Sequence, residues 1–205
     1  MRITKYTHAC VRLEHDGGVL VIDPGIWAEP AALAGADAVL ITHEHVDHID
    51  VMRLAGVNVP VHAPAGARIG GLDDLRGLDI TPVEVGAELT VAGFSVRAVG
   101  GRHAHIHGDQ PDCANVGYLV DGRVYHPGDA LHVPDEPVET LLVPASAPWL
   151  KLTEAIDFVN AVRPQRALPI HDALMNERGA QITGRLLDQL TETDYRYLAP
   201  GESLD

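Results

Sequence analysis

Short apolar runs follow one another along the first part of the chain, and their pattern predicts β-strands. Apolar and polar side chains alternate over residues 9–14, which is the period of a half-buried strand. Residues 19–23 and 37–42 are short and mostly apolar, as fully buried strands are. Asp16-Gly17-Gly18 provides a turn between the first two strands, and Pro24-Gly25 ends the second.

The middle of the chain has the same character. Six further strands are predicted, over residues 59–62, 88–91, 94–99, 115–120, 124–125 and 140–143. Asp121-Gly122 separates the fourth of these from the fifth, and this residue pair favours a tight hairpin. Residues 65–70 are a candidate short helix.

Helical spacing dominates the last third of the chain. Apolar residues recur at the i, i+3, i+4, i+7 positions of an amphipathic helix, namely Ala155, Phe158, Val159 and Val162. Thr153 is a candidate N-cap of this helix, and Pro164 closes it. A strand over residues 166–170 and a second amphipathic helix over residues 177–190 follow. An earlier helix is predicted from about Asp47 to Leu54.

Strands in two groups with interspersed helices predict an α+β fold of packed layers. The sequence has no fixed repeat, low-complexity tract or obvious linker, so we expect one domain over residues 1–205.

Composition and charge narrow the choice of partners. The apolar runs are strand-sized and far shorter than the roughly 20 residues that cross a bilayer. The first residues lack the basic-then-apolar pattern of a signal peptide, so we expect a cytoplasmic protein. The net charge of −14 repels phosphate backbones and argues against nucleic acid. Cys10 and Cys113 are expected to be reduced thiols.

Histidine is unusually abundant, and its clustering indicates a metal site. Three of the 12 histidines lie within residues 42–50 and three within residues 101–108. The first cluster forms the string His43-x-His45-x-Asp47-His48, directly after a predicted buried strand. In an extended loop His43 and His45 project to the same side, because side chains alternate with a period of two. Imidazole and carboxylate are ligands that zinc prefers, so a polar loop with accidental histidines is the weaker explanation.

Three more candidate ligands follow predicted strands, namely His103, Asp129 and His171. Groups at the carboxyl ends of several strands can converge at one edge of a sheet, and a site of six or seven ligands requires such convergence. His105 and His107 lie close enough to compete with His103, and the sequence does not choose among them.

The string of His43, His45, Asp47 and His48, followed by a later His, a Gly-Asp pair and a final His, resembles the metallo-β-lactamase superfamily. This resemblance extends from the strand end at Asp23 to His171. Thr7-His8-Ala9, Gly101-x-His103-Ala104 and His126-Pro127-Gly128-Asp129 further resemble the branch that contains ascorbate-6-phosphate lactonase.

The resemblance implies a four-layer αββα sandwich with two metal ions at one edge. It assigns His43, His45 and His103 to the first metal, and Asp47, His48 and His171 to the second, with Asp129 bridging the two. Zinc is the expected metal, and manganese or iron remains an alternative.

A dinuclear zinc hydrolase is therefore the working hypothesis. A metal-bound hydroxide attacks the substrate, Asp47 receives or relays a proton, and Asp129 completes the catalytic centre. The expected substrate is a small ester, a lactone or a phosphorylated metabolite. A phosphodiesterase or nuclease-type activity, or a metal-binding protein without catalysis, are the alternatives. The oligomeric state is left open.

Several neighbouring residues have two interpretations each. His8 is either a neighbour of the metals or a surface histidine, and His126 is a candidate structural partner. Asp23 either fixes a ligand histidine through its second ring nitrogen or caps the turn at Pro24. We assign Trp27 and Trp149 to packing, and Arg102 and Lys151 to the surface.

Overall fold

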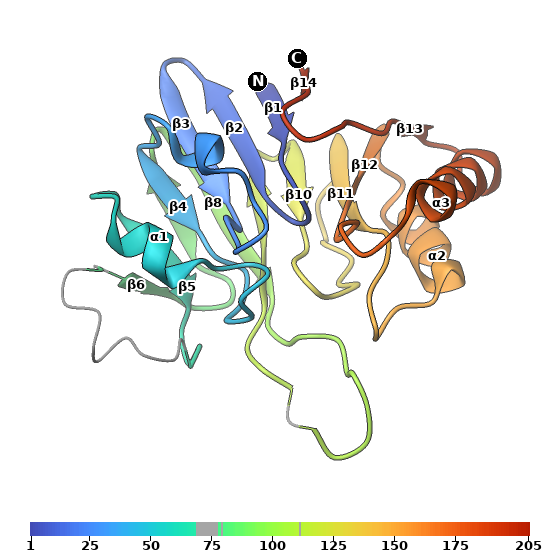
Figure 1. The fold of residues 1–205 in the computed structure, drawn as a ribbon, viewed down its shortest axis with the longest axis horizontal. Coiled ribbons are helices and arrows are strands. Elements are labelled where there is room, and N and C mark those ends of the chain that lie inside the picture. Colours follow the sequence, from blue (N-terminus) through green and yellow to red (C-terminus); the bar gives the residue numbers. More distant parts are fainter. Residues whose placement is uncertain (69–77, 79, 111) are drawn as a thin grey trace.

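The computed structural model describes residues 1–68, 78, 80–110 and 112–205, and it consists of two seven-stranded sheets with helices outside them (Figure 1). The first sheet has the order β14-β1-β2-β3-β4-β5-β6, with β1 (Arg2–Lys5), β2 (Val11–His15), β3 (Gly18–Ile22), β4 (Ala38–Leu40), β5 (Val61–Pro64), β6 (Ile80–Val83) and β14 (Ser203–Leu204). The second has the order β13-β12-β11-β10-β9-β8-β7, with β7 (Glu88–Val91), β8 (Phe94–Gly100), β9 (Val116–Val120), β10 (Val124–His126), β11 (Thr140–Pro144), β12 (Arg166–Ile170) and β13 (Asp194–Tyr195).

The helices cover the outer faces of the sheets. The first sheet carries the 3-10 helix η1 (Pro30–Leu33) and α1 (Val51–Ala55), and the second carries α2 (Leu152–Val162) and α3 (Glu177–Leu190) (Figure 1). In the described part of the chain no helix has both the length and the apolar character that a bilayer span requires.

Alternation along single strands sorts the core into three layers of buried side chains. In β3, Leu20 and Ile22 lie between the two sheets, whereas Val21 points outward against η1 and α1. In β11, Leu142 lies between the sheets, and its neighbour Leu141 packs under α2 and α3. Because side chains alternate across a sheet, each sheet buries both of its faces. The α+β fold and the αββα layering are confirmed.

The helix near the first histidine cluster is shorter than predicted. It begins at Val51 rather than near Asp47, and the Asp50 side chain caps it by accepting a hydrogen bond from the Arg53 backbone N–H at 2.9 Å. Residues 45–49 form a turn instead, in which His48 and Ile49 donate backbone hydrogen bonds to the His45 carbonyl. Asp50 offers a better cap because its carboxylate reaches the open N–H groups of the first turn.

Other boundaries differ as well. The cap of α2 is Lys151 rather than Thr153, because Glu154 accepts a hydrogen bond from the Lys151 backbone N–H. Residues 65–68 of the candidate short helix form a turn and a loop, and 69–70 lie outside the described residues. Four strands were not anticipated, namely β1, β6, β13 and β14.

The direction of the strands places the segments that follow them at one edge of each sheet. β3 and β4 are parallel, and β1 runs the same way because it is antiparallel to β2, which is antiparallel to β3. In the second sheet β8, β10, β11 and β12 all run in one direction by the same reasoning. The carboxyl ends of these strands therefore share one edge within each sheet.

Candidate metal centre

The seven predicted ligands gather where the strand ends of the two sheets meet. The string from His43 to His48 follows β4 of the first sheet. His103, Asp129 and His171 follow β8, β10 and β12 of the second sheet. His43, His48, His103, Asp129 and His171 are buried, and His45 and Asp47 are partly exposed.

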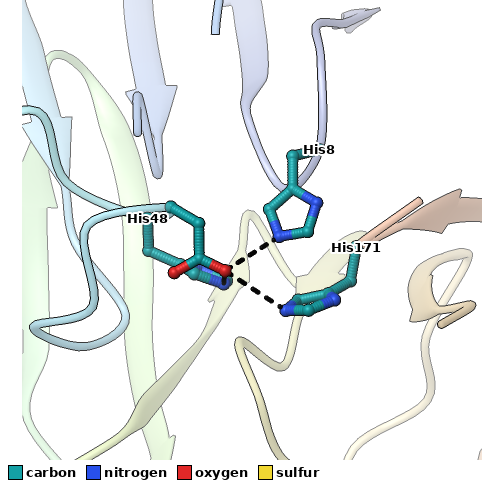
Figure 2. Close-up of side chains that lie close together, drawn as sticks. His8, His48 and His171 are labelled. Atoms are coloured by element: carbon teal, nitrogen blue, oxygen red, sulfur yellow. Dashed lines mark hydrogen bonds and ion pairs between the residues drawn. The ribbon is translucent and has the colours of Figure 1, made fainter. Parts of the chain in front are cut away.

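These residues form two compact groups, together with one residue that was not among the predicted ligands. One group consists of His43, His45, His103 and Asp129, and the other of His8, Asp47, His48 and His171. Within each group the nitrogen and carboxylate oxygen atoms lie within 4.8 Å of one another. In Figure 2 the rings of His8, His48 and His171 converge on one carboxylate, which is that of Asp47.

Asp129 connects the two groups. Its Oδ1 lies 3.1 Å from His48 Nε2, and its Oδ2 lies 3.0 Å from His171 Nε2 and 3.4 Å from His103 Nε2. The carboxylate therefore touches histidines of both groups, which is the position a bridging ligand needs. Gly128 holds this turn in a left-handed conformation, with φ of 64°. A Cβ there would collide with the Asn115 side chain, which accepts the Asp129 backbone N–H.

Hydrogen bonds behind the rings fix which nitrogen faces the centre. The Nδ1 atoms of His103 and His171 each contact a backbone carbonyl at 2.5 Å, and a carbonyl can only accept. His48 Nδ1 lies 2.7 Å from the buried Asp23 carboxylate. Since each Nδ1 carries a proton, Nε2 is the only nitrogen of each ring that can offer a lone pair to a metal ion.

His43 follows the same rule through Thr42. The Thr42 hydroxyl donates its one proton to Asp23 Oδ2 at 2.6 Å, so it accepts from His43 Nδ1 at 3.0 Å. His45 is different, because its Nδ1 faces His43 Nε2 at 3.1 Å and its Nε2 lies 3.9 Å from the Cys113 sulfur.

The donor set fits divalent metal ions. Four buried atoms at the centre have no hydrogen-bond partner among the described residues, namely His48 Nε2, His103 Nε2, His171 Nε2 and Asp129 Oδ1. Leaving buried polar atoms unpaired costs about 1–3 kcal/mol each. Imidazole nitrogen and carboxylate oxygen are ligands that zinc binds, and bound metal would satisfy all four.

The pKa shifts of the buried histidines and of Asp129 also favour a bound metal ion. Burial lowers the pKa of His43 well below its usual value, and nearby His48 adds to the shift. Burial raises the pKa of Asp129, but the adjacent imidazoles, His48 foremost, outweigh it and hold that pKa well below its usual range. Burial lowers the pKa of His48, but Asp129 and Asp23 outweigh it and raise that pKa well above its usual value. A cation between these carboxylates is therefore favoured.

The structure places the residues whose roles the sequence left open. His103 joins the first group, whereas His105 and His107 are exposed and His105 pairs with Asp112 at 2.8 Å. Asp23 contacts His48 and so acts behind a ligand candidate. Arg102 is exposed, in agreement with its assignment to the surface.

Contacts in the structure also indicate the roles of His126, Trp149 and the two cysteines. His126 is buried and structural, since its Nε2 lies 2.9 Å from the Ala9 carbonyl. Trp149, assigned to packing, also donates its indole N–H to Asp129 Oδ2 at 3.0 Å. The Cys113 sulfur contacts His45. No sequence pattern predicts this contact or the one between Trp149 and Asp129. Both cysteines are free thiols, and Cys10 is buried.

Comparisons with known proteins agree with this geometry. The family model described as "Beta-lactamase superfamily domain" matches residues 2–171. The protein Rv0786c of Mycobacterium tuberculosis is 40% identical over 99% of this chain and 98% of its own length. The UPF0173 metal-dependent hydrolase MK1542 of Methanopyrus kandleri is 28% identical over the full length of both chains.

A solved structure supports the fold. The metallo hydrolase Igni18 of Ignicoccus hospitalis superposes with a TM-score of 0.76 over 99% of this chain and 97% of its own, at 18% identity. The narrower resemblance to the lactonase branch stays a prediction. Fold, donor groups and family model agree, and the chain belongs to the metallo-β-lactamase superfamily.

Proposed function

We propose that the protein is a metal-dependent hydrolase with a dinuclear centre that cleaves a small ester or lactone. One observation carries the proposal, namely that two adjacent groups of candidate metal ligands meet at a single buried carboxylate, Asp129. The name of the similar Methanopyrus protein, a metal-dependent hydrolase, supports the same class.

The geometry supports one assignment of ligands. His43, His45 and His103 would hold the first ion, and Asp47, His48 and His171 the second, with Asp129 between them. Zinc suits this nitrogen-rich set, and manganese or iron is the alternative. When bound, such ions would supply Lewis acidity and lower the pKa of a bound water towards neutrality.

Asp47 and Asp129 have different roles in this proposal, because they differ in exposure to solvent. Burial raises the pKa of Asp47, but its hydrogen bond to His8 and the charges of His48 and His8 together outweigh burial and lower the pKa to about 2, so it is a carboxylate at neutral pH. Its side chain is 20% exposed, the most open of the two aspartates. Such a low pKa makes Asp47 a weak base, so it can relay a proton from an attacking water to solvent but does not keep it, while the buried Asp129 stays in place.

Two cations on or beside the ligand-bearing segments are paired with carboxylates, which supports an uncharged substrate. Lys5 is buried and bound to Asp172 at 3.1 Å, and Arg102 lies 3.8 Å from Asp112. These two cations are already paired with carboxylates, so they are poor partners for a phosphate. A phosphorylated metabolite is therefore less favoured than an ester or lactone, and phosphodiester cleavage is the second candidate on the same centre.

The test is Asp129→Ala, with Asp188→Ala on the exposed side of α3 as the matched control. Protein purified without chelators is assayed for metal content and for turnover of esters, lactones and phosphodiesters. We expect Asp129→Ala to lose turnover by about 10³-fold or more while remaining folded, and the control to be unchanged. Full activity in Asp129→Ala would overturn the proposal. Two bound metals in the wild type without any turnover would favour the non-catalytic alternative.

A further inference from the structure

We propose that His8 is a positioning residue that donates a hydrogen bond to Asp47 and does not bind metal. The proposal rests on the metal centre described under the proposed function. His8 is fully buried beside the second group of ligands, and it was not among the predicted ligands. By proximity alone it could be a ligand or a supporting residue.

The ring of His8 has its proton on the nitrogen that faces the centre. Its Nδ1 accepts a hydrogen bond from the backbone N–H of Ala173 at 3.4 Å. A neutral imidazole carries one proton, so Nε2 must hold it. Nε2 lies 3.1 Å from Asp47 Oδ2, and the contact is therefore Nε2–H donating to the carboxylate (Figure 2).

This arrangement is the reverse of that in the ligand histidines. His48, His103 and His171 each place Nδ1 against an acceptor, which leaves the Nε2 lone pair free for metal. His8 instead places Nδ1 against a donor. A protonated Nε2 has no lone pair to offer a metal ion, so the side chain supports Asp47 from behind.

His8 also contacts His171, a second candidate ligand of the same group. Its backbone carbonyl accepts from the His171 backbone N–H at 3.2 Å, and the centroids of the two rings lie 4.0 Å apart. Both residues have left-handed backbones, with φ of 69° at His8 and 56° at His171. Such conformations cost energy in non-glycine residues and persist where the surroundings fix them. One residue thus positions two ligands of the same group.

Three variants separate a donor from a ligand. In His8→Gln the side-chain amide N–H can replace Nε2–H as a donor to Asp47, but glutamine is a poor zinc ligand. His8→Asn is too short to reach Asp47 but tolerates the left-handed backbone well, and His8→Ala removes both functions. Metal content and zinc affinity are measured by competition with a chromophoric chelator. We expect His8→Gln within a few-fold of wild type, and His8→Asn and His8→Ala to bind the second zinc about 10–100-fold more weakly.

The tautomer is read directly from long-range ¹H–¹⁵N NMR spectra of the histidine rings, with His8→Gln to assign the His8 signals. We expect the proton on Nε2 of His8. A proton on Nδ1 would overturn the proposal. So would a His8→Gln variant as weak as His8→Ala, which would make His8 a ligand, or three variants that all bind like wild type. A wild type that binds two zinc ions but catalyses nothing would overturn the proposed function and leave these measurements decisive for His8.

Discussion

Asp23 is a single buried carboxylate that orients two histidines of the candidate metal centre. It accepts from the Thr42 backbone N–H at 2.7 Å, from the Thr42 hydroxyl at 2.6 Å and from His48 Nδ1 at 2.7 Å. The Thr42 hydroxyl, having given its proton to Asp23, can only accept from His43. The ring orientations of His43 and His48 therefore both depend on the acceptor oxygens of Asp23.

Replacing one acceptor oxygen should disturb both rings. In Asp23→Asn the amide N–H₂ would face either His48 Nδ1–H or the Thr42 backbone N–H, so a donor would meet a donor in either amide orientation. We expect zinc affinity to fall by about 10–100-fold, measured by chelator competition. The left-handed backbone at residue 23, with φ of 51°, suits asparagine, so the fold should survive. Unchanged zinc affinity would mean that Asp23 does not set the ring orientation.

Trp149 provides a second residue-scale test. Its indole N–H bonds the Asp129 carboxylate, and hydrogen bonds to charged groups contribute about 1.5–3 kcal/mol. Trp149→Phe keeps an aromatic ring and removes the donor, and we expect zinc to bind about 10-fold more weakly. Trp27→Phe is the control, because its ring contacts His8 edge-on without touching Asp129. Equal zinc affinity in both variants would contradict the role of the indole.

At the scale of elements, the turn over residues 45–49 decides where Asp47 and His48 lie. The segment after β3 clamps this turn, since Ile26 N–H donates to the Val46 carbonyl at 2.9 Å and Asp50 N–H to the Pro24 carbonyl at 3.0 Å. Gly25 lies so close that a Cβ would collide with the backbone of Asp47 and His48. Two backbones can approach this closely only where the side chain is absent.

Gly25→Ala is therefore expected to displace the turn. We expect loss of stability by about 1–3 kcal/mol in urea unfolding, together with loss of zinc binding. Gly179→Ala in α3 is the matched control, because its Cβ would make ordinary contacts of 3.5 Å or more. That variant should be neutral or more stable by about 0.5–1 kcal/mol and should keep its zinc. Normal zinc binding in Gly25→Ala would show that the close approach is unimportant.

At the scale of the whole molecule, the centre joins the two sheets. His43, His45, Asp47 and His48 come from the end of β4 in the first sheet, and the other three ligand candidates come from the second. A bound ion would cross-link the halves of the sandwich, and it would bind only where both are folded.

Metal should therefore stabilise the folded protein. Free zinc at 100 times its Kd adds about 2.7 kcal/mol, which for a chain of this size corresponds to about 5–10 °C in Tm. Differential scanning calorimetry, with and without a chelator, measures the shift. We expect the shift to shrink in Asp129→Ala, because that variant lacks the shared ligand. An identical Tm with and without metal would contradict a centre that spans the sheets.

The sequence by itself determined the strand pattern of the core, the long C-terminal helices and the string of candidate ligands with its later partners, because these depend on periodicity and local spacing. The short apolar run of residues 19–23 and the helical spacing in residues 177–190 correspond to β3 and α3. It placed the start of α1 too early, and it did not find the short edge strands, whose pairing depends on distant segments.

Tertiary structure decided the rest. The choice of His103 over His105 depends on which side chain the loop after β8 turns inward, and local spacing is the same for both. The donor role proposed for His8 depends on the backbone N–H of Ala173, 165 residues away. Ring protonation is set by the partner behind each ring, and those partners meet only when the two sheets pack together.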